Sequence, residues 1–283
     1  MDSAEMSQSA ALANYMSQGE RLSYARFGSG PELFLLHPTP VDHRFWLPLA
    51  FHLQDRYTIT IPDLRGHGSS AAGRGEISMA KLAIDVERLL GELKIESACF
   101  AGCSVGSYVL YELWRRRPDC IRALAFCCGK PQPDDAAARE KRKANIALIE
   151  EQGAAAFFDK TIGALFSPAF FEQQPAKVAT LRAAMDAVTA GAAIAIQQGL
   201  MERPDSRPTI GTISVPVLAL AAQKDALASP AEMQAIPELL PAAEYHQLDR
   251  AGHFAPYEEP ETVGGILDRF FARVCRSEAS PRE

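Results

Sequence analysis

The segment 101–107, Ala-Gly-Cys-Ser-Val-Gly-Ser, joins two different kinds of secondary structure within a few residues. The short apolar run before it is typical of a buried strand, and the residues after it have the pattern of a helix. A serine at so sharp a bend must take up a strained backbone conformation, and its neighbours approach adjacent strands closely. Gly102 and Gly106 have no Cβ atom to clash there. The pattern therefore predicts an elbow that exposes the Ser104 hydroxyl beside the first N–H groups of the helix.

This elbow lies within a series of strands that alternate with helices. The expected strands are 32–37, 57–61, 98–101, 121–128, 215–220 and 244–248, and the clearest helices are 78–93, 230–239 and 260–274. Parallel strands in such a series need right-handed crossovers, which place helices on both faces of the sheet. The sequence therefore predicts an α/β fold with a mostly parallel central sheet flanked by helices. Weak alternation around Gln18-Gly19-Glu20 predicts an antiparallel hairpin before the first of these strands.

The alternation of strands and helices stops after residue 130 and resumes only near residue 208. The residues between are rich in alanine, have helical patterns and contain phenylalanines interspersed with glycine and proline. This composition predicts a helical cap (lid) at 131–207, inserted between two parts of one core, 14–130 and 208–276. The remaining residues, 1–13 and 277–283, are expected to form flexible tails.

The charge and the cysteines restrict the partners and the compartment. A net charge of −6, with only two short basic runs at 115–117 and 141–143, argues against nucleic acid as a partner. The N-terminus is polar, and no apolar stretch approaches membrane-spanning length, which argues against a membrane partner. The six cysteines show neither C-x-x-C spacing nor a disulfide framework, which favours a cytoplasmic protein. A small-molecule substrate is the expected partner, and the sequence leaves open whether the chain forms a homodimer.

Ser104 can act as a nucleophile only with a base, a group that orients the base, and donors for an oxyanion. His253 is the histidine in a loop that follows a late strand, and Asp225 lies in the loop after the strand 215–220. Serine, then acid, then histidine is the order expected along a chain that carries its serine on such an elbow. All three residues follow strands, so they are expected at the carboxyl edge of the sheet, where ligands bind.

Each partner also has a simpler interpretation, and other acids compete for the orienting role. Asp225 alone could be an ordinary turn residue, and His253 alone a loop histidine with local hydrogen bonds. Asp249 lies in the same loop as His253, four residues earlier, where exposure to solvent is the better expectation. Asp134 and Asp135 follow the strand after the elbow and form a weaker alternative. The occurrence of serine, acid and histidine in order favours the catalytic interpretation.

Five motifs of the chain resemble those of the α/β-hydrolase superfamily. They are L-L-H-P-T-P, I-P-D-L-R-G-H-G-S-S, G-C-S-V-G, V-P-V-L-A-L-A-A-Q-K-D and A-G-H-F-A-P-Y-E-E-P-E. The resemblance extends from about residue 21 to 272 and leaves only the cap without a signature. Within the superfamily the chain is most similar to the esterase, lactonase and enol-lactonase branch, including the R-P-D-S at 203–206 that leads out of the cap.

The resemblance implies a role for each candidate. Ser104, Asp225 and His253 would form a catalytic triad, with the serine as nucleophile, the histidine as base and the aspartate holding the imidazole. The N–H groups of Thr39 and Val105 would form the oxyanion hole.

The chain departs from the family at His37-Pro38, where a His-Gly pair is common. The donor survives this change, since Thr39 keeps its own N–H and Pro40 confines it to an extended backbone. By the same resemblance, the polar residues nearby brace this loop and a tight turn and take no part in the chemistry. They are His37, Asp63, Arg65 and His67.

The residue at the elbow implies a reaction class. Relatives that carry aspartate there form an alkyl-enzyme ester, whereas Ser104 implies acyl transfer through an acyl-enzyme. The resemblance thus implies a serine hydrolase that cleaves a carboxylic ester or lactone of a small organic substrate, with no metal or organic cofactor. A C–C bond hydrolase, a biosynthetic acyltransferase or cyclase, and a non-catalytic ligand receptor remain as alternatives.

Overall fold

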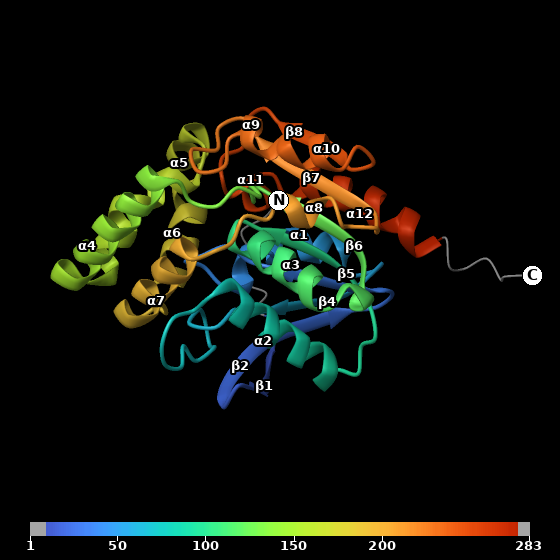
Figure 1. The fold of residues 1–283 in the computed structure, drawn as a ribbon, viewed down its shortest axis with the longest axis horizontal. Helices are drawn as coiled ribbons and strands as arrows, with labels where there is room; N and C mark the ends of the chain where they lie inside the picture. Colours follow the sequence, from blue (N-terminus) through green and yellow to red (C-terminus); the bar gives the residue numbers. More distant parts are fainter. Residues whose placement is uncertain (1–9, 277–283) are drawn as a thin grey trace, which may run out of the picture.

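An eight-stranded sheet forms the centre of the computed structural model, which describes residues 10–276 (Figure 1). The strands are β1 (Leu12–Ser17), β2 (Glu20–Gly28), β3 (Glu32–Leu36), β4 (Thr58–Pro62), β5 (Ala98–Cys103), β6 (Ile121–Cys127), β7 (Val217–Ala222) and β8 (Glu244–Leu248). Their order across the sheet is β1-β2-β4-β3-β5-β6-β7-β8. The pairs β1–β2 and β2–β4 are antiparallel, and all other neighbours are parallel. The predicted mostly parallel sheet is confirmed.

Helices cover both faces of this sheet (Figure 1). Those of the core are α1 (Leu47–Leu53), α2 (Met79–Glu92), α3 (Val105–Arg116), α8 (Arg207–Ile210), α9 (Pro230–Met233), α10 (Ala235–Leu239), α11 (Ala255–Glu258) and α12 (Pro260–Arg276). Side chains alternate between the faces along each strand. Leu33 and Leu35 of β3 pack in the apolar cluster that contains residues of α1 and α12. Phe34 and Leu36 pack in the cluster that contains residues of α2 and α3.

Several element boundaries differ from those expected. β7 lies two residues later than the predicted strand, because Pro216 has no N–H for the sheet and because Ala222 still pairs with Leu248. The predicted helix 230–239 is divided into α9 and α10. Pro237 cannot donate a hydrogen bond to the carbonyl four residues before it, which weakens a continuous helix there. The short helix α11 begins in a segment expected to be a loop.

Local signals account for the first turns of the chain. Gln18 and Gly19 have φ values of 50° and 81° and form the two-residue turn between β1 and β2, so the predicted hairpin is present. The Ser78 hydroxyl accepts a hydrogen bond from the N–H of Lys81 at 3.3 Å and begins α2. β1 starts at Leu12, inside the segment expected as a tail, while residues 1–9 and 277–283 lie outside the described residues.

Helices between β6 and β7 lie together on one side of the molecule, in the segment predicted to be a cap, and are called the cap below (Figure 1). They are α4 (Ala136–Thr161), the 3-10 turn η4 (Ile162–Leu165), α5 (Pro168–Gln173), α6 (Pro175–Met185) and α7 (Ala190–Met201). The contacts between the cap and the core include two main-chain hydrogen bonds. The N–H of Phe254, in the loop before α11, donates to the carbonyl of Leu165 at 2.9 Å. The N–H of Ile77 donates to the carbonyl of Ala195 in α7 at 3.3 Å.

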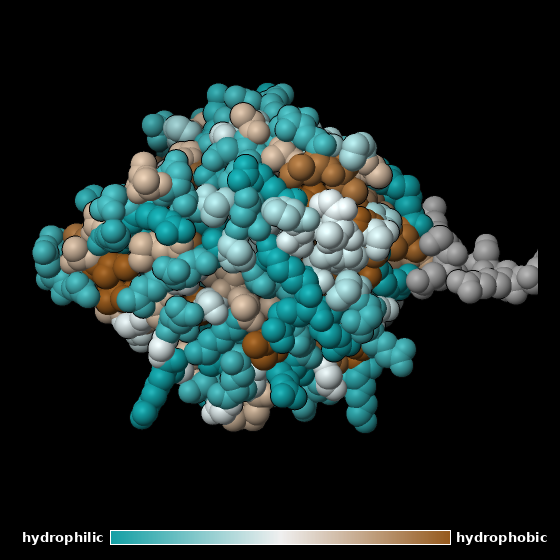
Figure 2. All heavy atoms as spheres, viewed as in Figure 1, coloured by the Kyte–Doolittle hydropathy of each residue, from teal (hydrophilic) through white to brown (hydrophobic). Residues whose placement is uncertain are grey.

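The exterior of the described residues is mainly polar on the face drawn in Figure 2, where apolar side chains form separate small groups. Within residues 10–276, no single helix is long and apolar enough to cross a membrane. Helices α6 and α7 reach that length and composition only as a pair, and they are bent by 95° at the break between them.

Candidate active site

Ser104 occupies the sharp bend between the end of β5 and the start of α3. Its backbone has φ 50° and ψ −112°, a conformation that L-residues rarely adopt and that costs on the order of 1–3 kcal/mol. The surroundings leave no room for a side chain at the positions two residues before and two residues after Ser104. A Cβ atom on Gly106 would lie 2.1 Å from the carbonyl oxygen of Leu36, and one on Gly102 would lie 2.4 Å from the Gly106 backbone. The two glycines therefore permit the elbow, as the pattern predicts.

His253 and Asp225 form a hydrogen-bonded pair in two loops of the same edge of the sheet. His253 Nδ1 lies 2.8 Å from Asp225 Oδ2 and 3.0 Å from Oδ1. Oδ1 also accepts the N–H groups of Leu227 at 2.7 Å and Ala228 at 2.9 Å. Burial alone would raise the pKa of Asp225, but the charge and hydrogen bond of His253 and these backbone donors hold it below its usual value. The carboxylate therefore stays ionised and accepts a hydrogen bond from the Nδ1–H of His253.

The three candidates are almost withdrawn from solvent. The exposed fractions of Ser104, Asp225 and His253 are 8%, 7% and 3%. Among residues 10–276, the Ser104 hydroxyl forms no hydrogen bond, while its N–H donates to the carbonyl of Cys127 at 3.0 Å. Ser104 follows β5, Asp225 follows β7 and His253 follows β8, so all three lie at the carboxyl ends of parallel strands.

The competing acids have other positions and partners. Asp249 is exposed and pairs with no described residue. Asp134 is buried between Arg142 and Arg203, which hold its pKa below the usual value against the effect of burial. Asp135 accepts the N–H of Ala138 at 2.8 Å and caps α4. Asp225 is thus the carboxylate that the structure brings to His253.

The expected oxyanion donors lie in two segments, one at the elbow and one after β3. Val105 is the first residue of α3, so its N–H has no acceptor within the helix. Thr39 follows the end of β3 and precedes Pro40, to which it is joined by a cis peptide bond. Its hydroxyl lies 2.8 Å from Nε2 of His67. No backbone acceptor among residues 10–276 takes the N–H of Thr39 or of Val105.

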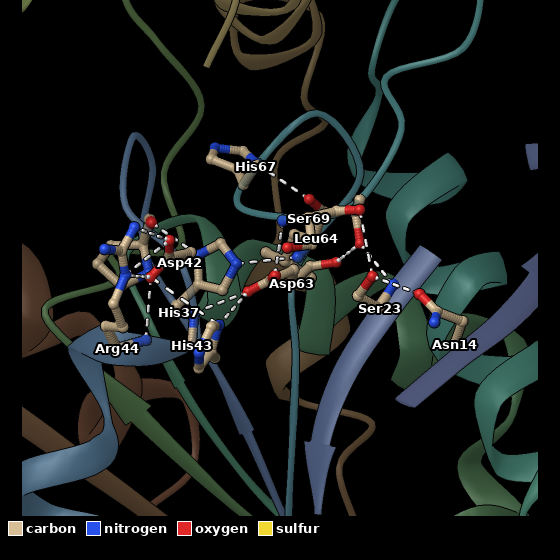
Figure 3. A network of polar contacts seen from close by, with 12 residues as sticks. Asn14, Ser23, His37, Asp42, His43, Arg44, Asp63, Leu64, His67 and Ser69 are labelled. Carbon is tan, nitrogen blue, oxygen red and sulfur yellow. Dashed lines mark hydrogen bonds and ion pairs between the residues drawn. The ribbon is translucent and has the colours of Figure 1, made fainter. Parts of the chain in front are cut away.

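Two buried histidines brace the loop that carries Thr39 (Figure 3). His37 donates from Nδ1 to the carbonyl of Pro38 at 2.9 Å and accepts the N–H of Leu64 on Nε2 at 2.9 Å. Nδ1 of His67 lies 3.1 Å from the carbonyl of Arg65, so its Nε2 accepts the Thr39 hydroxyl. Burial lowers the pKa of both rings, to about 3 for His67. Both rings therefore stay neutral at physiological pH.

Asp63 organises the tight turn that follows β4 (Figure 3). Its Oδ1 accepts the N–H and Nδ1 of His43 at 2.9 and 2.7 Å, and its Oδ2 accepts the N–H of Ser69 at 2.8 Å. Asp42, beside them, pairs with Arg44 at 2.6 Å. The ligand atoms of Asp42, His43 and Asp63 lie within 4.8 Å of one another, but each of them already has a protein partner. We therefore assign this cluster a structural role.

The family of the chain follows from comparison with known proteins. The sequence model of the alpha/beta hydrolase family matches residues 33–264 of this chain. The chain belongs to this family. The resemblance deduced from the five motifs is thereby confirmed.

The matches to individual members of the family cover nearly the whole chain. It is 27% identical over 260 residues to 3-oxoadipate enol-lactonase 2 of Acinetobacter baylyi, covering 90% of this chain and 96% of that protein. It is 27% identical over 257 residues to a pimeloyl-[acyl-carrier protein] methyl ester esterase of Xanthomonas campestris, covering 87% and 97% of the two chains. A solved thermophilic esterase of Thermogutta terrifontis superposes with a TM-score of 0.88 at 27% identity, covering 94% and 99%.

One buried acid of this hydrolase was not expected from the sequence. Glu258 of α11 lies five residues after His253 and binds residues of both the cap and the His253 loop. It stands within the motif A-G-H-F-A-P-Y-E-E-P-E, but nothing in that string distinguishes it from Glu259. Its partner Ser167 is 91 positions away in a segment without a signature.

Proposed function

We propose that this hydrolase cleaves a carboxylic ester or lactone of a small organic substrate through an acyl-enzyme on Ser104. The observation that carries the proposal is the buried Asp225–His253 pair at the sheet edge where the Ser104 elbow lies. The similarity to an enol-lactonase and to a methyl ester esterase supports an ester or lactone as the bond that is cleaved.

In the proposed mechanism, Asp225 accepts a hydrogen bond from the Nδ1–H of His253, which keeps the proton on Nδ1 and leaves the lone pair of Nε2 free to act as base. Ser104 attacks the substrate carbonyl, and its proton moves to Nε2. The N–H groups of Thr39 and Val105 stabilise the oxyanion of the tetrahedral intermediate. The imidazolium then returns the proton to the leaving alkoxide, so that an alcohol departs and an acyl-Ser104 ester remains.

The second half of the reaction repeats these roles with water as the nucleophile. His253 removes a proton from water, which attacks the acyl carbonyl, and the same N–H groups hold the second oxyanion. Collapse of this intermediate returns the proton to Ser104 and releases the acid. A lactone gives a single hydroxy acid by the same steps, because its alcohol and acyl parts remain joined.

The cap supports a small substrate for this site. Its Leu165 accepts a hydrogen bond from the loop of His253, and its Ala195 accepts one from Ile77 in the segment before α2, so it is anchored to the core beside the proposed base and beside α2. The acidic net charge of −6 supports a site that serves neither nucleic acid nor an anionic membrane. We place the protein in the cytoplasm, because the spacing of its six cysteines forms no disulfide framework, as is usual in a reducing compartment.

The test is the Ser104→Ala variant, assayed on p-nitrophenyl acetate and on a simple γ-lactone. Loss of a triad serine lowers kcat by roughly 10⁶, so activity should fall to the background rate. A phosphonate ester should label the wild-type enzyme once, at Ser104, and leave the variant unlabelled. Ser69→Ala is the matched control, because Ser69 is exposed and uses only its backbone N–H and carbonyl.

The results separate the proposal from its rivals. A Ser104→Ala variant that keeps activity within about tenfold of the wild type would exclude the serine as nucleophile. A wild-type protein that binds lactones tightly and turns none of them over would instead be a receptor. In either case the triad assignment would be wrong.

A further inference from the structure

Glu258 joins two segments that are far apart in the chain. Its side chain is buried, and its Oε1 accepts the N–H of Gly252 at 3.0 Å, immediately before His253. Its Oε2 accepts the hydroxyl of Ser167 at 2.6 Å, and the Ser167 N–H lies 3.1 Å from Oε2 and 3.2 Å from Oε1. Ser167 belongs to the cap and begins α5. The carboxylate therefore collects three donors and forms no ion pair with a described residue.

The two segments that Glu258 joins are in direct contact. A Cβ atom on Gly252 would lie 2.3 Å from the nitrogen of Ser167 and 2.5 Å from the carbonyl carbon of Phe166. Two residues after Gly252, the rings of Phe254 and Phe166 have centroids 5.3 Å apart and lie edge to face. Only glycine fits so close to another backbone, so the cap segment 165–167 and the loop 252–254 are packed as one unit.

His253 is held from several directions within this unit. Asp225 binds its ring, and the thiol of Cys103, the residue before the nucleophile, lies 3.6 Å from its carbonyl oxygen. Glu258 accepts a hydrogen bond from the N–H of Gly252, the residue immediately before His253. Burial raises the pKa of Glu258, and the hydrogen bonds from Ser167 and Gly252 offset this effect only in part.

We infer that Glu258 is a positioning residue that couples the cap to the catalytic base. This inference rests on the proposed function, in which His253 takes the proton of Ser104. The same carboxylate binds the loop of the base and the first turn of α5, so a shift of the cap segment also displaces His253. The same contact therefore holds both the cap segment and the proposed base in place.

The test compares Glu258→Gln, Ser167→Ala and the double variant by kcat and KM for p-nitrophenyl acetate, with active sites counted by phosphonate titration. Glutamine has the size of glutamate, but its NH₂ group replaces one of the two acceptor oxygens. This donor would face the N–H or O–H donors of Gly252 and Ser167, so at least one hydrogen bond is lost. Glu259→Gln is the matched control, because Glu259 is the next residue and its carboxylate binds no described side chain. Counting active sites separates loss of folded enzyme from loss of rate per folded site.

We expect Glu258→Gln to lower kcat per titrated site about 10-fold to 100-fold, with KM changed by less than about threefold, since displacing a catalytic group by a fraction of an ångström has effects of this size. Ser167→Ala should lower kcat by a smaller factor. The double variant should be no slower than Glu258→Gln, because both changes break the same contact. Glu259→Gln should match the wild type.

Three outcomes would overturn the inference while leaving the proposed function intact. One is a Glu258→Gln enzyme with wild-type kcat per site and only a lower melting temperature, as for a purely structural acid. Another is a raised KM at unchanged kcat, as for a residue that shapes substrate binding. The third is a double variant in which the two losses multiply. Failure of the proposed function would appear differently, as an inactive and untitratable wild-type protein.

Discussion

Replacing Asp225 by asparagine reverses the tautomer of His253 while it preserves the size of the side chain. Oδ1 of Asp225 faces the N–H groups of Leu227 at 2.7 Å and Ala228 at 2.9 Å, so the amide oxygen of asparagine must take this position. The NH₂ group then occupies the place of Oδ2, which lies 2.8 Å from His253 Nδ1. Nδ1 must accept a hydrogen bond from this group, and the ring proton moves to Nε2. A ring protonated on Nε2 cannot take the proton of Ser104.

The expected loss follows from this tautomer. Holding the base in the wrong form lowers kcat by about 10⁴, or about 5 kcal/mol of transition-state stabilisation at roughly 1.4 kcal/mol per decade. KM should change little, because Asp225 binds His253 and the loop backbone. The assay is p-nitrophenyl acetate hydrolysis per phosphonate-titrated site. Asp249→Asn is the control, since Asp249 is exposed, and its kcat should stay within about twofold of the wild type.

The two aspartate variants together decide the assignment. An Asp225→Asn enzyme within about tenfold of the wild-type kcat would show that this carboxylate does not orient the base. A large loss in Asp249→Asn instead would move the acid to that residue, and the side-chain positions in the loops after β7 and β8 would then be wrong.

Three further changes test the elbow, the oxyanion loop and the buried histidines. Gly106→Ala should lower kcat about 100-fold or more because its Cβ would lie 2.1 Å from the Leu36 carbonyl oxygen, whereas Gly91→Ala meets nothing within 4 Å and should keep full activity. Thr39→Pro deletes the proposed oxyanion donor and should lower kcat by about 10² to 10³, measured against Thr39→Ala, which keeps the N–H. His67 has a pKa of about 3 when folded against an ordinary value of 6.5, so the unfolded chain binds more protons between these values. The stability tied to neutral His67 is therefore complete above about pH 6.5 and is lost as the pH falls towards 3, and urea unfolding of His67→Gln should show a shallower decline.

Much of the core could be predicted because it depends on patterns that are short in sequence. The strand β8 has the predicted bounds, and Ser78 caps α2 as expected. Each follows from apolar periodicity or from a side chain next to the turn that it forms. One error, at the end of β7, occurred where pairing between distant strands decided the outcome. β7 continues to Ala222 because Leu248 of β8 pairs with it, which the local sequence around residue 220 does not reveal.

The candidate site divides in the same way. Ser104, Asp225 and His253 were expected because each follows a strand, and the parallel sheet places strand ends at one edge. Asp225 was preferred to Asp249 because the resemblance implied it and Asp249 was expected to be exposed, as it is in the structure. Glu258 and Ser167 could not be paired in advance, because their contact depends on how the cap folds back onto the core across 91 positions.

The histidines of this edge show why residue type alone does not identify a base. His37 and His67 donate from Nδ1 to main-chain carbonyls, and burial lowers their pKa, so neither ring can hold a second proton near neutral pH. Nδ1 of His253 faces the carboxylate of Asp225, whose charge can stabilise an imidazolium as it forms. A neutral ring fixed by carbonyls gives a rigid loop for the Thr39 donor, and a ring beside a carboxylate can accept and return a proton. The partner of Nδ1 therefore separates His37 and His67 from His253, whereas His43, whose Nδ1 faces the Asp63 carboxylate, belongs to the tight turn after β4.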